Sequence, residues 1–303
     1  MWNKSKAILK LCYTPYSIFS PFPFFAIIIF LIAQKSVNFS TLYFSQLISG
    51  IAASMLSSFA SNIWNHTNDL VDDSAQGKIN ALTQNIISQK SGIILSLVLY
   101  LLSIILFIYS SIISGRPAYL FFLVWALITW WYSDRLFLNK IFGFRLKNHY
   151  VGEFITYSIA YPMYTLSIWL VYSDINSAAI ALALAFLSFG ISVVLIKDLK
   201  DISGDRKANL RTFGVVFPPS KLFHYSCIFL LLYYIIIFLS IANDILSGSI
   251  LLIVIPFVYF IRSTFLHFTK KEWKIGIKDN AQIKTLVIST YISILILGAG
   301  ALF

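Results

Sequence analysis

Two short acidic segments stand out in this sequence of 303 residues. The first reads NHTNDLVDD over residues 65–73, and it carries amides but no arginine. The second reads KDLKDISGDRKANLRT over residues 197–212. Half of the chain's 12 acidic residues lie in these two segments, namely Asp69, Asp72, Asp73, Asp198, Asp201 and Asp205. Carboxylates concentrated in this way are oxygen donors of the kind that bind hard divalent cations.

Helical spacing would place each set of carboxylates on one face. The first segment contains two rows with intervals of four residues, Asn65–Asp69–Asp73 and Asn68–Asp72–Gln76. At about 3.6 residues per turn, each row lies on one side of a helix. Carboxylates on one face repel unless a cation lies between them, and oxygen ligands without Cys or His favour Mg²⁺, whose shell is completed by water and substrate phosphates. We therefore predict Mg²⁺ ligands among Asn65, Asn68, Asp69, Asp72, Asp73, Asp198, Asp201 and Asp205. Either row of the first segment fits this prediction.

The elements that must position these carboxylates are membrane-spanning helices. Hydrophobic residues make up 58% of the chain and charged residues 12%, about half of the charged share in a soluble domain. Apolar runs of about 18 residues or more are typical of membrane spans. Nine such runs occur, at 17–34, 42–63, 92–114, 117–133, 151–173, 177–196, 222–243, 246–266 and 283–302. The sequence thus predicts an all-α, polytopic membrane protein, with residues 1–303 forming one domain of about nine helices.

The basic residues predict the orientation of this bundle. With nine spans, 21 of the 23 Lys and Arg residues fall on the side of the N-terminus, and only Lys35 and Arg116 fall on the other. Positive loops stay in the cytoplasm. We expect the N-terminus and both acidic segments to be cytoplasmic and the C-terminus, Phe303, to be extracytoplasmic. The net charge of +11 then reflects topology and lipid contact, and predicts no nucleic-acid partner.

Both acidic segments resemble motifs of the UbiA superfamily of intramembrane prenyltransferases. The first is similar to the family pattern NDxxDxxxD or NxxxDxxxD, and the second to KDxxDxxGDRxxGxxT. Between them, YSDRLFLNKIFGFRLKNHYVGE at residues 132–153 resembles the family's YS…RLK…GE segment. The resemblance covers about residues 60–217 and implies a UbiA-like bundle around a central cavity. It departs from the pattern at Gln76, at Asn209, and in a longer loop after Ser133 without the usual prolines.

The resemblance implies the transfer of an isoprenyl chain from a prenyl diphosphate, with Mg²⁺ as cofactor. The implied catalytic residues are Asp69, Asp72, Asp198 and Asp201. Donors to the diphosphate oxygens are expected from Lys147, Arg145, Lys197 and Arg206. Aromatic faces stabilise cations, so an allylic cation and the acceptor are expected beside Tyr132, Tyr157 and Tyr161.

The sequence leaves more than one class of acceptor open. An aromatic, quinone-precursor-like acceptor is the first expectation, and a geranylgeranylglyceryl phosphate-type lipid acceptor is the alternative. A membrane terpene cyclase could use the same diphosphate-ionising motifs without an acceptor. A transporter is a remote alternative, because several spans carry no acidic residue at mid-helix.

Overall fold

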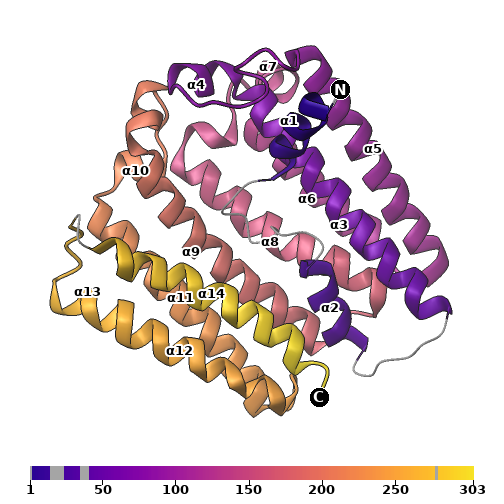
Figure 1. Cartoon of the computed structure of the whole chain (residues 1–303). Coiled ribbons are helices and arrows are strands. Elements are labelled where there is room, and N and C mark those ends of the chain that lie inside the picture. Colours follow the sequence, from indigo (N-terminus) through magenta and orange to yellow (C-terminus); the bar gives the residue numbers. More distant parts are fainter. Residues whose placement is uncertain (1, 14–23, 35–40, 277–278) are drawn as a thin grey trace.

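The computed structural model describes residues 2–13, 24–34, 41–276 and 279–303, which form a bundle of helices without a strand in those ranges (Figure 1). Seven segments are long and apolar enough to cross a membrane: α3 (Thr41–Asn68), α5 (Gln89–Ser114), α8 (Tyr150–Tyr172), α9 (Ser177–Lys207), α11 (Pro219–Ala242), the segment Gly248–Lys270, and α14 (Asn280–Gly300). Two shorter apolar helices are α2 (Phe24–Gln34) and α6 (Ala118–Ser133). The described helices coincide with the nine predicted runs, although residues 17–23 of the first run and Lys35 lie outside the described residues.

The segment Gly248–Lys270 changes its helical type along its length. It comprises the 3₁₀ segment η2 (Gly248–Ile253), α12 (Val254–Phe260), the π-helical turn η3 (Ile261–Phe265) and α13 (Leu266–Lys270). Pro256 is the third residue of α12. The change from 3₁₀ to α-helix thus falls just before a proline, which cannot donate a backbone hydrogen bond.

The helices pack through small residues as well as large apolar ones. α3 lies against α5, α6 against α8, and α9 against both α8 and α11. The buried face of α3 is built largely from glycine, alanine and serine. Small side chains let helices approach closely in a membrane, where apolar burial alone does not favour association.

A layer of short elements covers one end of the bundle. It contains α1 (Trp2–Cys12), α4 (Leu70–Ala75), α7 (Leu138–Phe142), η1 (Leu146–Asn148) and α10 (Phe213–Val216). Figure 1 shows α1, α4 and α7 together at this end and the C-terminus at the opposite end. The N–H of Tyr150 donates to the carbonyl of Arg211 (2.8 Å), and the N–H of Arg211 donates to that of Asn148 (2.9 Å). These bonds join the loop between α6 and α8 to the chain that follows α9.

Candidate active site

A cavity of about 370 Å³ lies beneath this layer, between α3, α4, α6, α8 and α9. Residues of both acidic segments line it, together with basic and aromatic side chains from the intervening loop and helices. The predicted site residues that line it are Asn65, Asp69, Asp72, Asp73, Tyr132, Lys147, Tyr157, Tyr161, Lys197, Asp198, Asp201 and Asp205. Three predicted residues are absent from this lining, namely Asn68, Arg145 and Arg206.

The first acidic segment keeps its helical spacing across a break. α3 ends at Asn68 and α4 begins at Leu70. The N–H of Asp69 still donates to the carbonyl of Asn65 (2.9 Å), and that of Asp73 to the carbonyl of Asp69 (2.7 Å). The whole row Asn65–Asp69–Asp73 therefore faces the cavity.

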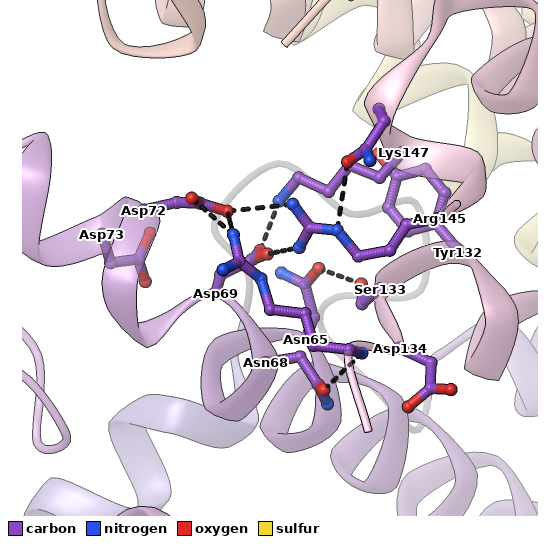
Figure 2. Close-up of polar contacts among 12 residues, drawn as sticks. Asn65, Asn68, Asp69, Asp72, Asp73, Tyr132, Ser133, Asp134, Arg145 and Lys147 are labelled. Atoms are coloured by element: carbon purple, nitrogen blue, oxygen red, sulfur yellow. Dashed lines mark hydrogen bonds and ion pairs between the residues drawn. The ribbon is translucent and has the colours of Figure 1, made fainter. Parts of the chain in front are cut away.

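Asn68 has a different role, which is visible in Figure 2. Its Nδ2 donates to the carbonyl of Trp64 (2.9 Å). Its Oδ1 accepts the backbone N–H of Arg135 (2.9 Å). The amide thus fixes the start of the loop after α6, and the row Asn68–Asp72–Gln76 is not uniformly directed to the cavity.

Three basic side chains from the loop after α6 pair with Asp69 and Asp72, although the first acidic segment itself contains no arginine. Arg145 contacts Asp69 through Nη1 (3.1 Å) and Asp72 through Nη2 (3.1 Å) (Figure 2). Arg135 contacts both oxygens of Asp72 through Nη2 (2.6 Å each). Lys147 contacts the second oxygen of Asp69. These partners come from the loop after α6, more than sixty positions along the chain, so the segment itself gave no sign of them.

The ion pairs keep this segment charged despite its burial. Burial by itself would raise the pKa of Asp72, but Arg135 and Arg145 hold that pKa below its ordinary value. Burial also opposes ionisation of Asp73, and His66 and Lys78 outweigh it, so the pKa of Asp73 is lowered as well. Both groups are therefore carboxylates at neutral pH, as ligands of a divalent cation must be.

The second acidic segment lies on a helix and not in a loop. The apolar run ends near residue 196, but α9 continues to Lys207 and carries all three carboxylates of the segment. Asp198 is 1% exposed, and its Oδ2 has no hydrogen-bond partner among the described residues. Asp205 accepts a hydrogen bond from Thr212 Oγ1 (2.8 Å). Among the described side chains, none of the three carboxylates forms a direct ion pair like those of Asp69 and Asp72.

The two acidic segments approach each other at Gly204. A Cβ atom at this position of α9 would lie 2.7 Å from the side chain of Gln76, at the end of α4. Asn209, which follows the end of α9, adopts φ 54°. Asparagine tolerates this left-handed conformation better than most residues, so Asn209 can stand where the family pattern has glycine.

Glu153 is a cavity residue that the sequence prediction omitted. It is 1% exposed, its Oε1 accepts the hydroxyl of Tyr132 (3.0 Å), and its Oε2 has no partner in the described part of the chain. It also lies close enough to Asp198 for their charges to interact. An acidic residue in a predicted span is by itself a signal of function, and Glu153 is the only acid in the run 151–173.

An aromatic wall borders the acidic part of the cavity. The ring centroids of Tyr132 and Tyr157 are 5.8 Å apart, and those of Tyr157 and Tyr161 are 5.9 Å apart. Trp125 of α6, which was not predicted, extends the wall. Arg206, in contrast, is exposed near the end of α9, so its predicted contact with the diphosphate remains a prediction.

The donor set fits Mg²⁺. Its side chains offer carboxylate and amide oxygens, and two buried carboxylate oxygens, on Glu153 and Asp198, lack a hydrogen-bond partner among the residues described. No three acidic, histidine or cysteine side chains of the described residues form a complete metal cluster. That agrees with a cation that usually takes one or two protein carboxylates and fills its shell with water and phosphate oxygens.

Comparison with known proteins assigns the family. The sequence model of the UbiA prenyltransferase family matches residues 21–278. An uncharacterized protein of Archaeoglobus fulgidus is 30% identical over 289 residues, which cover 94% of this chain and 93% of that protein.

Solved structures share the fold across almost the whole chain. A digeranylgeranylglyceryl phosphate synthase has a TM-score of 0.69 at 19% identity, and the match covers 99% of each chain. A UbiA homolog from Archaeoglobus fulgidus bound to DMAPP and Mg²⁺ has a TM-score of 0.58 at 15% identity, and the match covers 98% of this chain and 96% of that chain. A UbiA homolog from Archaeoglobus fulgidus bound to GPP and Mg²⁺ has a TM-score of 0.57 at 18% identity, and the match covers 91% of this chain and 96% of that chain. The chain belongs to the UbiA prenyltransferase family and is a membrane-embedded enzyme of that family.

Proposed function

We propose that this protein transfers the prenyl group of a prenyl diphosphate to an aromatic, quinone-precursor-like acceptor, with Mg²⁺ as cofactor. The observation that carries the proposal is the convergence of both acidic segments on one cavity that also has an aromatic wall. The UbiA homologs with the same fold are bound to DMAPP or GPP together with Mg²⁺. Because the chain belongs to this family of enzymes, we no longer propose a transporter.

The carboxylates of the two segments would hold Mg²⁺ between them. Asn65, Asp69, Asp72 and Asp73 contribute from one side of the cavity, and Asp198 and Asp201 from the other. Bound Mg²⁺ supplies positive charge that stabilises a departing diphosphate. Lys147 and Lys197 donate to its oxygens, and Arg145, which is buried behind Asp69 and Asp72, orients these two carboxylates.

The walls of the cavity guide the prenyl group and the acceptor. Tyr132, Tyr157 and Tyr161 present aromatic rings where positive charge develops on the allylic group, and rings stabilise such charge through their faces. The same rings keep water from the allylic carbon. The Oε2 of Glu153 has no hydrogen-bond partner among the described residues, so it is available to accept a hydrogen bond from an acceptor hydroxyl.

A glycerophosphate lipid is the second candidate acceptor, and one further observation favours it. A polar pocket of about 510 Å³ adjoins the site, lined by Arg135, Asn139, Arg145, Asn148 and the chain around Asn209. Guanidinium groups and amides of this kind bind phosphate well. The fold shared with a digeranylgeranylglyceryl phosphate synthase is compatible with this acceptor class.

The test is incubation of purified protein with labelled prenyl diphosphates and a panel of acceptors, with products identified by mass spectrometry. Prenylated aromatic products support the first acceptor class, and prenylated glycerophosphates would replace it with the second. Cyclic hydrocarbons formed without any acceptor would instead identify a terpene cyclase. Unchanged prenyl diphosphate in every mixture would refute the proposal.

We further propose that the acidic segments face the cytoplasm and that the C-terminus lies outside. The excess of basic residues at the end of the bundle that carries the acidic segments supports this orientation. At the opposite end, Arg116 pairs with Asp174 (3.3 Å). Cysteines placed at Gln76 and Asp174 should react with membrane-impermeant reagents from opposite sides, and labelling of both from one side would refute the orientation.

A further inference from the structure

We propose that Arg135 is an exchangeable counter-ion: Mg²⁺ displaces its guanidinium from Asp72, and the displaced group then binds the substrate diphosphate. The inference rests on the proposed function, because it needs Mg²⁺ and a diphosphate in the same cavity. Arg135 is the second residue of the loop that follows Ser133, and it was not among the predicted site residues.

The two arginines that contact Asp72 are held very differently. Arg145 is 4% exposed and uses all three types of guanidinium nitrogen, on Asn148 (3.0 Å), Asp69 (3.1 Å) and Asp72 (3.1 Å). Arg135 binds Asp72 alone, through Nη2, and its side chain is 33% exposed. Its Nε has no partner in the described ranges of the chain. Arg135 therefore has fewer bonds to lose than Arg145.

The backbone of Arg135 is held by more bonds than its side chain. Its N–H donates to Asn68 Oδ1 (2.9 Å), at the end of α3. The preceding carboxylate, Asp134, is fully buried and accepts the backbone N–H groups of Leu136 (2.9 Å) and Phe137 (3.0 Å). The adjoining pocket of about 510 Å³ gives the guanidinium space to turn. A displaced guanidinium would thus stay tethered beside the acidic segment.

Electrostatics gives the direction of the exchange. Arg135 contacts both oxygens of Asp72 at 2.6 Å, so Mg²⁺ at its usual distance of about 2.0–2.1 Å from either oxygen would compete with the guanidinium for that carboxylate. Mg²⁺ also repels the guanidinium, whereas a diphosphate attracts it. Planar guanidinium groups form paired hydrogen bonds with phosphate oxygens, which makes the diphosphate the natural new partner.

The experiment measures binding and not turnover, in full-length protein in lipid nanodiscs. Mn²⁺ binding without substrate is followed by electron paramagnetic resonance, and binding of a non-reactive prenyl thiolodiphosphate is measured at saturating Mg²⁺. Arg135→Gln should bind Mn²⁺ about tenfold more tightly and the thiolodiphosphate about tenfold more weakly. Arg135→Lys keeps the charge but loses the planar guanidinium. Its affinities for Mn²⁺ and for the thiolodiphosphate should lie between those of Arg135→Gln and the wild type. Lys140→Gln removes an exposed charge from the same loop and should match the wild type.

Two results would overturn the exchange. Mn²⁺ affinity that is unchanged or weaker in Arg135→Gln would show that the arginine does not compete with the metal. Unchanged thiolodiphosphate affinity would show that the displaced guanidinium does not bind the diphosphate. If the wild type bound neither probe, the proposed function would fail and this inference with it, whereas normal wild-type binding with Arg135→Gln equal to Lys140→Gln overturns the exchange alone.

Discussion

Replacement of Lys147 by alanine should impair the use of prenyl diphosphate selectively. The ammonium group of Lys147 lines the cavity and contacts Asp69, and its side chain is 16% exposed. The turn η1 that carries it is fixed by the bond from Arg211 N–H to the carbonyl of Asn148. A Cβ atom at Gly152 would lie 2.1 Å from the carbonyl oxygen of Leu146, so only glycine lets α8 begin so close to this turn.

The size of the effect follows from one charge-assisted hydrogen bond. Such a bond contributes about 1.5–3 kcal/mol, and about 1.36 kcal/mol corresponds to a factor of ten in rate. Lys147→Ala should therefore lower kcat/KM for prenyl diphosphate about ten- to a hundredfold. Asp69 retains Arg145 as its partner in the variant, so the fold should persist. The KM of the acceptor should change little, because a lysine acts on phosphate oxygens as a point charge.

The assay varies each substrate in turn at a saturating concentration of the other. Lys140→Ala is the matched control, because Lys140 lies exposed on α7 in the same loop. Wild-type kcat/KM in Lys147→Ala would refute the assignment of Lys147 to the diphosphate. An equal loss in Lys140→Ala would mean that general positive charge near the cavity, and not a specific contact, produces the effect.

Three further predictions concern the metal, the charge balance and the acceptor side of the cavity. Excess EDTA should abolish turnover, as should Asp69→Ala and Asp198→Ala in folded protein, and full turnover in EDTA would exclude the Mg²⁺ requirement. The lowered pKa of Asp73 means that its ion pairs stabilise the fold above the ordinary carboxyl pKa of about 3.9 and lose this effect as the pH falls through the lowered value. As the pH is lowered from about 5 to about 3, the unfolding temperature of the wild type should thus fall more steeply than that of Asp73→Asn. Parallel curves of unfolding temperature against pH would contradict this. Glu153→Gln should lower prenyl transfer at least about tenfold while prenyl alcohol still forms from the diphosphate, and unchanged transfer would remove Glu153 from the acceptor site.

Local properties of the sequence predicted the spans and the acidic row. An apolar run long enough to cross a bilayer must form a helix, because lipid offers no partners to backbone N–H and C=O groups. The spacing of Asn65, Asp69 and Asp73 needs only the helical repeat, and the structure keeps that repeat through the break at Asp69. Neither inference depends on which distant segments meet in the fold.

The counter-ions and the end of α9 required information that local patterns do not carry. Arg135 and Arg145 reach the first segment only because the loop after α6 folds back over α3 and α4, and hydropathy does not specify that fold. Hydropathy also ends the sixth run near residue 196, whereas α9 continues to Lys207. Its last turn carries Arg206 and Lys207, and basic residues there favour a helix through its dipole.

The two acidic segments differ in how their carboxylates are paired, so substitutions in them should differ in their effect on the stability of the fold. In the first segment, Arg145 and Lys147 hold Asp69, so Asp69→Ala leaves buried cations with fewer partners and should destabilise the fold. In the second, Asp198 is buried with an oxygen that has no hydrogen-bond partner among the described residues, which is itself unfavourable. Removing that carboxylate should cost little stability, although both changes remove a proposed Mg²⁺ ligand. The ion pairs of the first segment thus help to maintain this end of the bundle, whereas the second segment keeps a buried carboxyl oxygen without a hydrogen-bond partner among the described residues, which a bound cation would coordinate.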